Sequence, residues 1–188
     1  VSEGYRPGGT NRTTQLGATY DADFLTNYEF GFKTILMDGR MRLNGAAYTM
    51  EWDDIQLGWF DSSISLLGLV DNIGAAQSMG FEIDSQIILS DRLSATFAFA
   101  KNDAVLTENY VLRGNTEAYK DQDLPFTPDT KGNIGLTAEI SDTSRIDFNY
   151  AFVAGMYNDL FFDDREFQDS YGIGNLSYTM DVSDQASI

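Results

Sequence analysis

The segment 25–57 constrains the fold most, because two arms of alternating side chains meet there across an Asp38-Gly39 turn. In the first arm, the mostly apolar residues that share one face are Tyr28, Phe30, Phe32, Thr34 and Leu36. The residues between them, on the other face, are Asn27, Glu29, Gly31 and Lys33. A pleated strand imposes this period of two, and Asp-Gly is a typical hairpin turn. The segment predicts a β-hairpin with one apolar face, which fits both a soluble sandwich and a membrane barrel.

The rest of the chain repeats the pattern. The strands that we predict lie near residues 1–8, 26–37, 40–59, 71–89, 92–106, 130–141, 144–157 and 170–183. Tight turns at 37–40, 90–92 and 141–144 alternate with long loops at 9–25, 60–70, 107–129 and 158–169. This layout is typical of a bacterial outer-membrane barrel, whose short turns lie in the periplasm. In strand 40–59 the run from Ala46 to Met50 makes the alternation ambiguous, as a β-bulge would.

Composition excludes several classes of function. The chain of 188 residues contains neither Cys nor His, so it has no disulfide and no thiolate or imidazole for a metal. A Ser-His-Asp catalytic triad is impossible within it, and we expect no enzyme activity. A net charge of −17 opposes binding to nucleic acid, whose phosphates it would repel. No apolar run approaches the roughly 20 residues of a membrane-spanning helix.

Four segments carry a resemblance to a known family. They are SEGYRPGGTN (2–11), LTNYEFGFK (25–33), LMDGRMRLNGAAYTMEWDDIQL (36–57) and NIGAAQSMGFEID (72–84). In this order they resemble the C-terminal part of the β-barrel of TonB-dependent outer-membrane receptors. One departure is Met37, which is inserted in the family's Leu-Asp-Gly-Arg turn. The resemblance covers nearly the whole chain and is more specific over the first 90 residues than beyond residue 105.

The resemblance implies an all-β fold, an antiparallel transmembrane β-barrel segment. Its eight strands are similar to strands 13 to 20 of a larger, 22-stranded barrel. Residues 1–188 would then form a single partial domain, with the N-terminal plug and the final strands absent. The implied localisation is the bacterial outer membrane, where the partners are lipid and lipopolysaccharide. An open sheet of eight strands would have two unpaired edges, so we expect the fragment to have no independent function.

The implied function is active import of a scarce solute, most often a ferric siderophore or another iron complex. The TonB complex would supply the energy through the absent plug, and the ligand would be a small metal chelate. The resemblance also leaves import of cobalamin or glycans open. Two different classes compete with a transporter: a complete small eight-stranded barrel that serves as an anchor or adhesin, and an outer-membrane lipase or protease. The absence of His and of a closing strand weighs against both.

Candidate substrate-binding residues lie in the long loops and at the predicted outer strand ends, where aromatic or cationic side chains can contact a solute. They are Arg6, Trp52, Trp59, Phe60, Tyr110, Tyr119, Phe161 and Phe162. The competing interpretation for most of these aromatics, together with Tyr48 and Tyr171, is a girdle at the level of the lipid headgroups. The carboxylates in segment 159–169 lack the spacing of a calcium loop, so we expect neither a metal site nor a cofactor.

Overall fold

A computed structural model of the chain describes residues 1–12, 18–59, 68–112, 115–158, 167–183 and 186–187. These residues form strands and turns, and no helix occurs among them. Within these ranges no helix has the length and apolar character needed to cross a membrane. The all-β class predicted from the alternation is confirmed.

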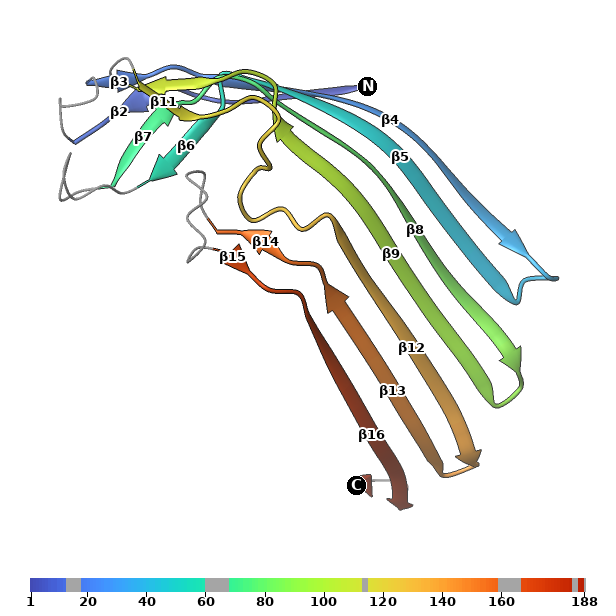
Figure 1. Cartoon of the computed structure of the whole chain (residues 1–188). Helices are drawn as coiled ribbons and strands as arrows, with labels where there is room; N and C mark the ends of the chain where they lie inside the picture. The colour runs from blue at the N-terminus through green and yellow to red at the C-terminus, as the bar shows by residue number, and fades with distance from the viewer. Residues whose placement is uncertain (13–17, 60–67, 113–114, 159–166, 184–185, 188) are drawn as a thin grey trace.

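One antiparallel sheet dominates the fold and curves like a section of a barrel wall (Figure 1). Its strand order is β1-β4-β5-β8-β9-β12-β13-β16-β17. The bounds are β1 Ser2–Arg6, β4 Asp23–Leu36, β5 Met41–Asp53, β8 Ala76–Ser90, β9 Leu93–Leu106, β12 Thr130–Ser141, β13 Ser144–Val153, β16 Tyr171–Ser183 and β17 Ala186–Ser187. Each strand of this sheet pairs with the next sheet strand along the chain. Tight turns join β4 to β5, β8 to β9 and β12 to β13, and long connections join the other pairs from β1 to β16.

The tight turns all lie at one end of the sheet, as predicted (Figure 1). The first turn joins β4 to β5, where the Gly39 amide donates to the Leu36 carbonyl oxygen at 3.2 Å. Met37, Asp38 and Gly39 have φ angles of 55°, 55° and 90°. Such left-handed conformations match the right-handed twist of the two strands, and Asp and Gly adopt them more readily than other residues.

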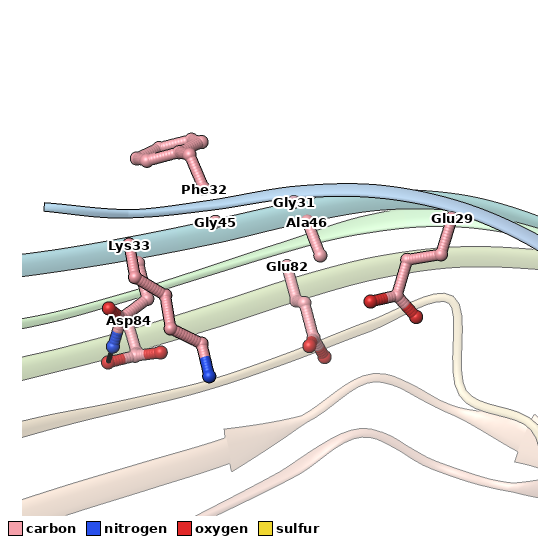
Figure 2. Close-up of a pocket in the computed structure, with 9 residues that line it drawn as sticks. Glu29, Gly31, Phe32, Lys33, Gly45, Ala46, Glu82 and Asp84 are labelled. Atoms are coloured by element: carbon pink, nitrogen blue, oxygen red, sulfur yellow. Dashed lines mark hydrogen bonds between the residues drawn. The ribbon is translucent and has the colours of Figure 1, made fainter.

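The two faces of the sheet differ as the alternation predicts. On the convex face, Phe30 is 77% exposed, and Phe32 lies in one row with Gly45 and Ile83. Glu29, Lys33, Glu82 and Asp84 extend from the opposite, concave face (Figure 2). The register between β4 and β5 runs without a shift from Phe24–Asp53 to Leu36–Met41. The ambiguity at Ala46-Ala47 therefore hides no β-bulge.

Three predicted strands are each divided into two strands in the structure. Segment 40–59 breaks at Asp54, which has a φ of 54°, and segments 71–89 and 144–157 also divide into two strands. The outer pieces form small hairpins in the long connections rather than extensions of the sheet. These short strands are β2 Gly9–Thr10 with β3 Thr19–Tyr20, β6 Gln56–Trp59 with β7 Leu69–Asn72, β10 Tyr110–Leu112 with β11 Asn115–Ala118, and β14 Met156–Tyr157 with β15 Phe167–Gln168.

The buried apolar cluster lies beneath these hairpins, at the ends of the strands opposite the tight turns. Its buried members are Ile55, Ile73, Ala76, Leu106, Tyr110 and Ala118. The side chains of Trp52, Leu57 and Leu124 pack against it from the partly exposed side. A single-layer sheet has no interior of its own. Side chains become buried in this cluster because those of the sheet and those of the outer hairpins pack against each other.

Candidate functional site

Asp23 is the centre of a polar cluster at the outer end of the sheet. It is the first residue of β4, and only 1% of its surface is exposed. Its carboxylate accepts hydrogen bonds from the Arg6 amide at 3.1 Å, from Arg6 Nε at 2.9 Å and from Trp52 Nε1 at 3.0 Å. The Gln56 amide donates to it at 3.3 Å, and Arg6 Nη2 completes an ion pair. One carboxylate thus joins β1, β4, β5 and β6.

The charge of Asp23 is stabilised in this position. A tilted strand crosses the membrane with about 9 to 11 residues, so Asp23, 14 residues from the Met37 turn, lies outside the spanning segment. Burial raises the pKa of its carboxyl, but the hydrogen bonds from Arg6, Gln56 and Trp52 outweigh burial, and the pKa is lower than usual. The Arg6 guanidinium also lies over the Trp52 ring, 5.1 Å from its centroid.

The apolar cluster continues from Trp52 toward the third outer connection. The Tyr110 hydroxyl donates to Asp71 Oδ2 at 2.8 Å, which links β10 to β7. The Leu124 amide donates to the Ala104 carbonyl oxygen at 2.8 Å, so segment 119–124 lies along the end of β9. Hairpins β6–β7 and β10–β11 are therefore packed on the wall and on each other through buried side chains.

The concave face is polar along β4, β5 and β8. A hollow of about 580 Å³ is lined there by Glu29, Lys33, Asn44, Glu82 and Asp84, among others (Figure 2). Asn44 Nδ2 donates to Asp84 Oδ2 at 2.9 Å, and the Tyr48 hydroxyl donates to Asn102 Oδ1 at 3.0 Å. Carboxylates, amides and an ammonium group on a concave wall provide a surface that water wets. No grouping of acidic residues in the described ranges could hold a metal ion.

The structure brings two of the predicted binding residues, Arg6 and Trp52, into direct contact, and it places Tyr110 in the adjacent apolar cluster. These three side chains are thus already occupied by contacts within the chain. Tyr119 is 58% exposed on the third outer connection. Trp59 ends β6, where its backbone pairs with Leu69. Phe60, Phe161 and Phe162 lie outside the described residues, as does most of the acidic segment 159–169.

The lipid-girdle interpretation is wrong for three aromatic residues. The Tyr48 and Trp52 side chains make their hydrogen bonds with inward-facing partners, and Tyr110 is buried. Sequence reasoning missed Asp23 and Gln56, the two residues that hold the outer cluster together. Nothing in the pattern distinguishes Asp23 from the neighbouring Asp21, because the pairing with Arg6 depends on the register of β1 against β4.

Solved structures with the same fold are outer-membrane receptors. The ferric yersiniabactin uptake receptor FyuA from Yersinia pestis is 19% identical, with a TM-score of 0.78, over 99% of this chain and 27% of that one. The siderophore receptor PiuA from Acinetobacter baumannii is 16% identical, with a TM-score of 0.71, over 93% and 24%. The pyoverdine receptor FpvA from Pseudomonas aeruginosa is 13% identical, with a TM-score of 0.65, over 97% and 27%.

The chain therefore spans about a quarter of the length of these receptors. No curated protein sequence matches it. The family described as TonB dependent receptor-like, beta-barrel, matches residues 1–187. Proteins of this family are β-barrels of the bacterial outer membrane and act as transporters, which agrees with the alternating faces and the alternating short and long connections. The chain belongs to the TonB-dependent receptor β-barrel family.

Proposed function

We propose that this chain is part of a receptor that imports an iron chelate, most simply a ferric siderophore, across the outer membrane with energy from the TonB complex. The observation that carries the proposal is a polar concave wall that leads away from a group of packed outer hairpins. The names of the similar structures support the substrate class, since they include receptors for ferric yersiniabactin and pyoverdine.

In this proposal residues 1–188 supply wall and outer loops of a larger, 22-stranded barrel. A plug domain outside these residues closes the lumen and contacts TonB, while lipid and lipopolysaccharide surround the convex face. Exposed aromatic side chains of the outer loops capture the solute, because a flat ring can stack on a planar chelator. The solute then passes along the hydrated concave face.

The substrate class has one specific alternative. A copper transporter, OprC, shares the fold with a TM-score of 0.64 and 16% identity, so the same wall accompanies more than one type of cargo. Import of cobalamin or a glycan requires the same wall and a different set of loop contacts. Selectivity therefore depends on the outer loops rather than on the alternation of the strands.

The test is growth under iron starvation of a strain that lacks its own receptors. The full gene should restore growth on ferric chelates, and the segment 1–188 alone should not. Removal of the inner-membrane energy source should abolish growth on the chelate. Uptake of cobalamin or an oligosaccharide, without uptake of iron chelates, would contradict the proposed substrate but not the transporter class. Uptake that persists without the energy source would contradict the class.

A matched pair of variants tests the loops. Tyr119→Ala removes an exposed ring from the third outer connection, whereas Tyr5→Ala removes an exposed ring from β1, where Tyr5 stacks on Phe24. We expect Tyr119→Ala to raise the chelate concentration for half-maximal growth by about 2- to 10-fold, the effect of one aromatic contact. Tyr5→Ala should leave it unchanged. Equal effects of the two variants would contradict the proposal that Tyr119 contacts the solute.

A further inference from the structure

We propose that hairpins β2–β3 and β6–β7 move as one unit. Hydrogen bonds from the side-chain amides of Asn11 and Asn72 join the two hairpins, so neither can open without the other. Each hairpin is a separate two-stranded sheet, and their short strands come from different connections of the wall. They lie side by side at the outer end of the sheet (Figure 1).

Asn72, at the end of β7, binds the peptide groups of Asp21 beside β3. The Asp21 amide donates to Asn72 Oδ1 at 2.7 Å, and Asn72 Nδ2 donates back to the Asp21 carbonyl oxygen at 3.1 Å. The same Nδ2 donates to the Asp54 carbonyl oxygen at 2.6 Å, just before β6. One amide thus satisfies both hydrogen-bonding groups of a residue in the other hairpin's connection.

Asn11 makes the reciprocal contact from the other side. It follows β2, and its Nδ2 donates to the Val70 carbonyl oxygen at 2.8 Å while the Val70 amide donates to its Oδ1 at 3.0 Å. Gln56 adds a third connection, because its Nε2 donates to the Asp21 carbonyl oxygen at 2.8 Å and to that of Pro7 at 3.0 Å. The two hairpins are therefore joined in both directions.

The chemistry of these contacts requires an amide. A carboxamide presents a donor and an acceptor side by side, which is the arrangement that one strand presents to its antiparallel neighbour. A carboxylate of the same shape keeps the acceptor, but it places negative charge against the Val70 or Asp21 carbonyl oxygen. The substitution Asn→Asp therefore removes the hydrogen bond that the amide donates and adds repulsion, with almost no change in side-chain volume.

Both hairpins are also connected to Asp23. Its carboxylate binds Arg6, which precedes β2, and the amide of Gln56, which begins β6. Arg6 Nη2 in turn donates to the Gln56 carbonyl oxygen at 2.9 Å. The unit is thus held at its base by Asp23 and by Asn72, which pairs with Gln56, and farther along β7 by the contact of Asn11 with Val70. A solute that orders one hairpin orders the other, even if it contacts only one.

Hydrogen exchange of the full-length protein in detergent micelles tests whether the two hairpins are coupled. For each variant, the amide exchange rates are measured in the hairpin that does not carry the substitution. In Asn72→Asp we expect the amides of hairpin β2–β3, including the Asn11 amide bound to the Ala18 carbonyl oxygen, to exchange about tenfold faster. In Asn11→Asp the amides of hairpin β6–β7 should accelerate by a similar factor.

Asn109→Asp is the matched control, because Asn109 lies on the third outer connection, and among the described residues its Oδ1 accepts from the Lys120 amide at 2.8 Å. It makes the same change of charge and should leave both hairpins unchanged. Heat-modifiable migration on gels establishes that each variant retains an assembled barrel. The proposal is overturned if each Asn→Asp change accelerates exchange only in its own hairpin, or in neither. Because exchange is measured without solute, this result does not depend on the transport proposal.

Discussion

The assignment of the two faces can be tested at two adjacent positions of β9. Phe97→Arg places a guanidinium on the convex face. Phe97 is 42% exposed there, and its partners in the two neighbouring strands are Ser85 and Ile134. Phe97 is the fifth residue of β9. With a rise of about 3.3 Å per residue and a tilt of about 40°, it lies about 10 Å from the inner end of an apolar band about 25 Å tall. Its side chain is therefore within a few ångströms of the midplane.

At that depth an arginine on the lipid face costs about 2 to 4 kcal/mol of folding free energy. The control is Ala98→Arg, the next residue of the same strand, which has the same depth and faces the concave side. Its partners across the ladder are Asp84 and Asn133. A new guanidinium there can pair with the Asp84 carboxylate in a hydrated environment, so we expect a cost below about 1 kcal/mol.

The free energy of unfolding of the full-length variants can be measured by urea titration in micelles or lipid vesicles. The reasoning requires Phe97→Arg to be the less stable variant by at least about 1 kcal/mol. If Ala98→Arg were equally or more destabilising, the strand would be out of register by one residue, since such a slip exchanges the two faces completely.

Two more predictions concern the outer cluster and the topology. Because the folded pKa of Asp23 is lower than its ordinary value of 3.8, its contribution to stability should be complete above that value and be lost as the pH falls through the folded pKa. Asp23→Asn should therefore destabilise the hairpins by about 1 to 3 kcal/mol at neutral pH, measured by hydrogen exchange. The difference should shrink as the pH falls below 3.8, and a difference that does not shrink with increasing acidity would contradict this origin. Cysteine at Lys120 should react with an impermeant thiol reagent on intact cells, whereas cysteine at Asp91 or Asp142 should react only after the outer membrane is permeabilised; the reverse pattern would invert the orientation.

The strands of the sheet could be predicted from sequence because each strand shows its own alternation of apolar and polar residues, whatever its neighbours are. The alternation through Ile146, Phe148 and Tyr150 assigns the faces of β13 without knowledge of its neighbours, and the structure has the same faces. The turn at Asp38-Gly39 also depends on local preferences only. Strand ends were predicted less well, because the break at Asp54 depends on where β6 finds its partner β7.

The outer cluster could not be predicted for the opposite reason. Arg6 and Asp23 are 17 residues apart, and Asn11 and Val70 are 59 apart. Such pairs form only after the register of the sheet has brought the connections together, and nothing in the local sequence marks their members. The aromatic residues were misassigned for a related reason. A Trp or Tyr at a strand end suits the headgroup region equally well, and the hydrogen bonds of Trp52 with Asp23 and of Tyr110 with Asp71 join segments that are far apart in the sequence.

The sheet and the outer hairpins depend on the sequence in different ways. The wall needs only apolar residues on one face and small or polar residues on the other, so many sequences satisfy it, and an identity of 19% accompanies a TM-score of 0.78. The outer hairpins depend instead on single side-chain groups, such as the Asp23 carboxylate and the Asn72 amide, which are not part of the backbone ladder of the sheet. If the two hairpins move together as proposed, a change at Asn11 or Asn72 would alter the position of both hairpins while the backbone ladder of the sheet stays the same.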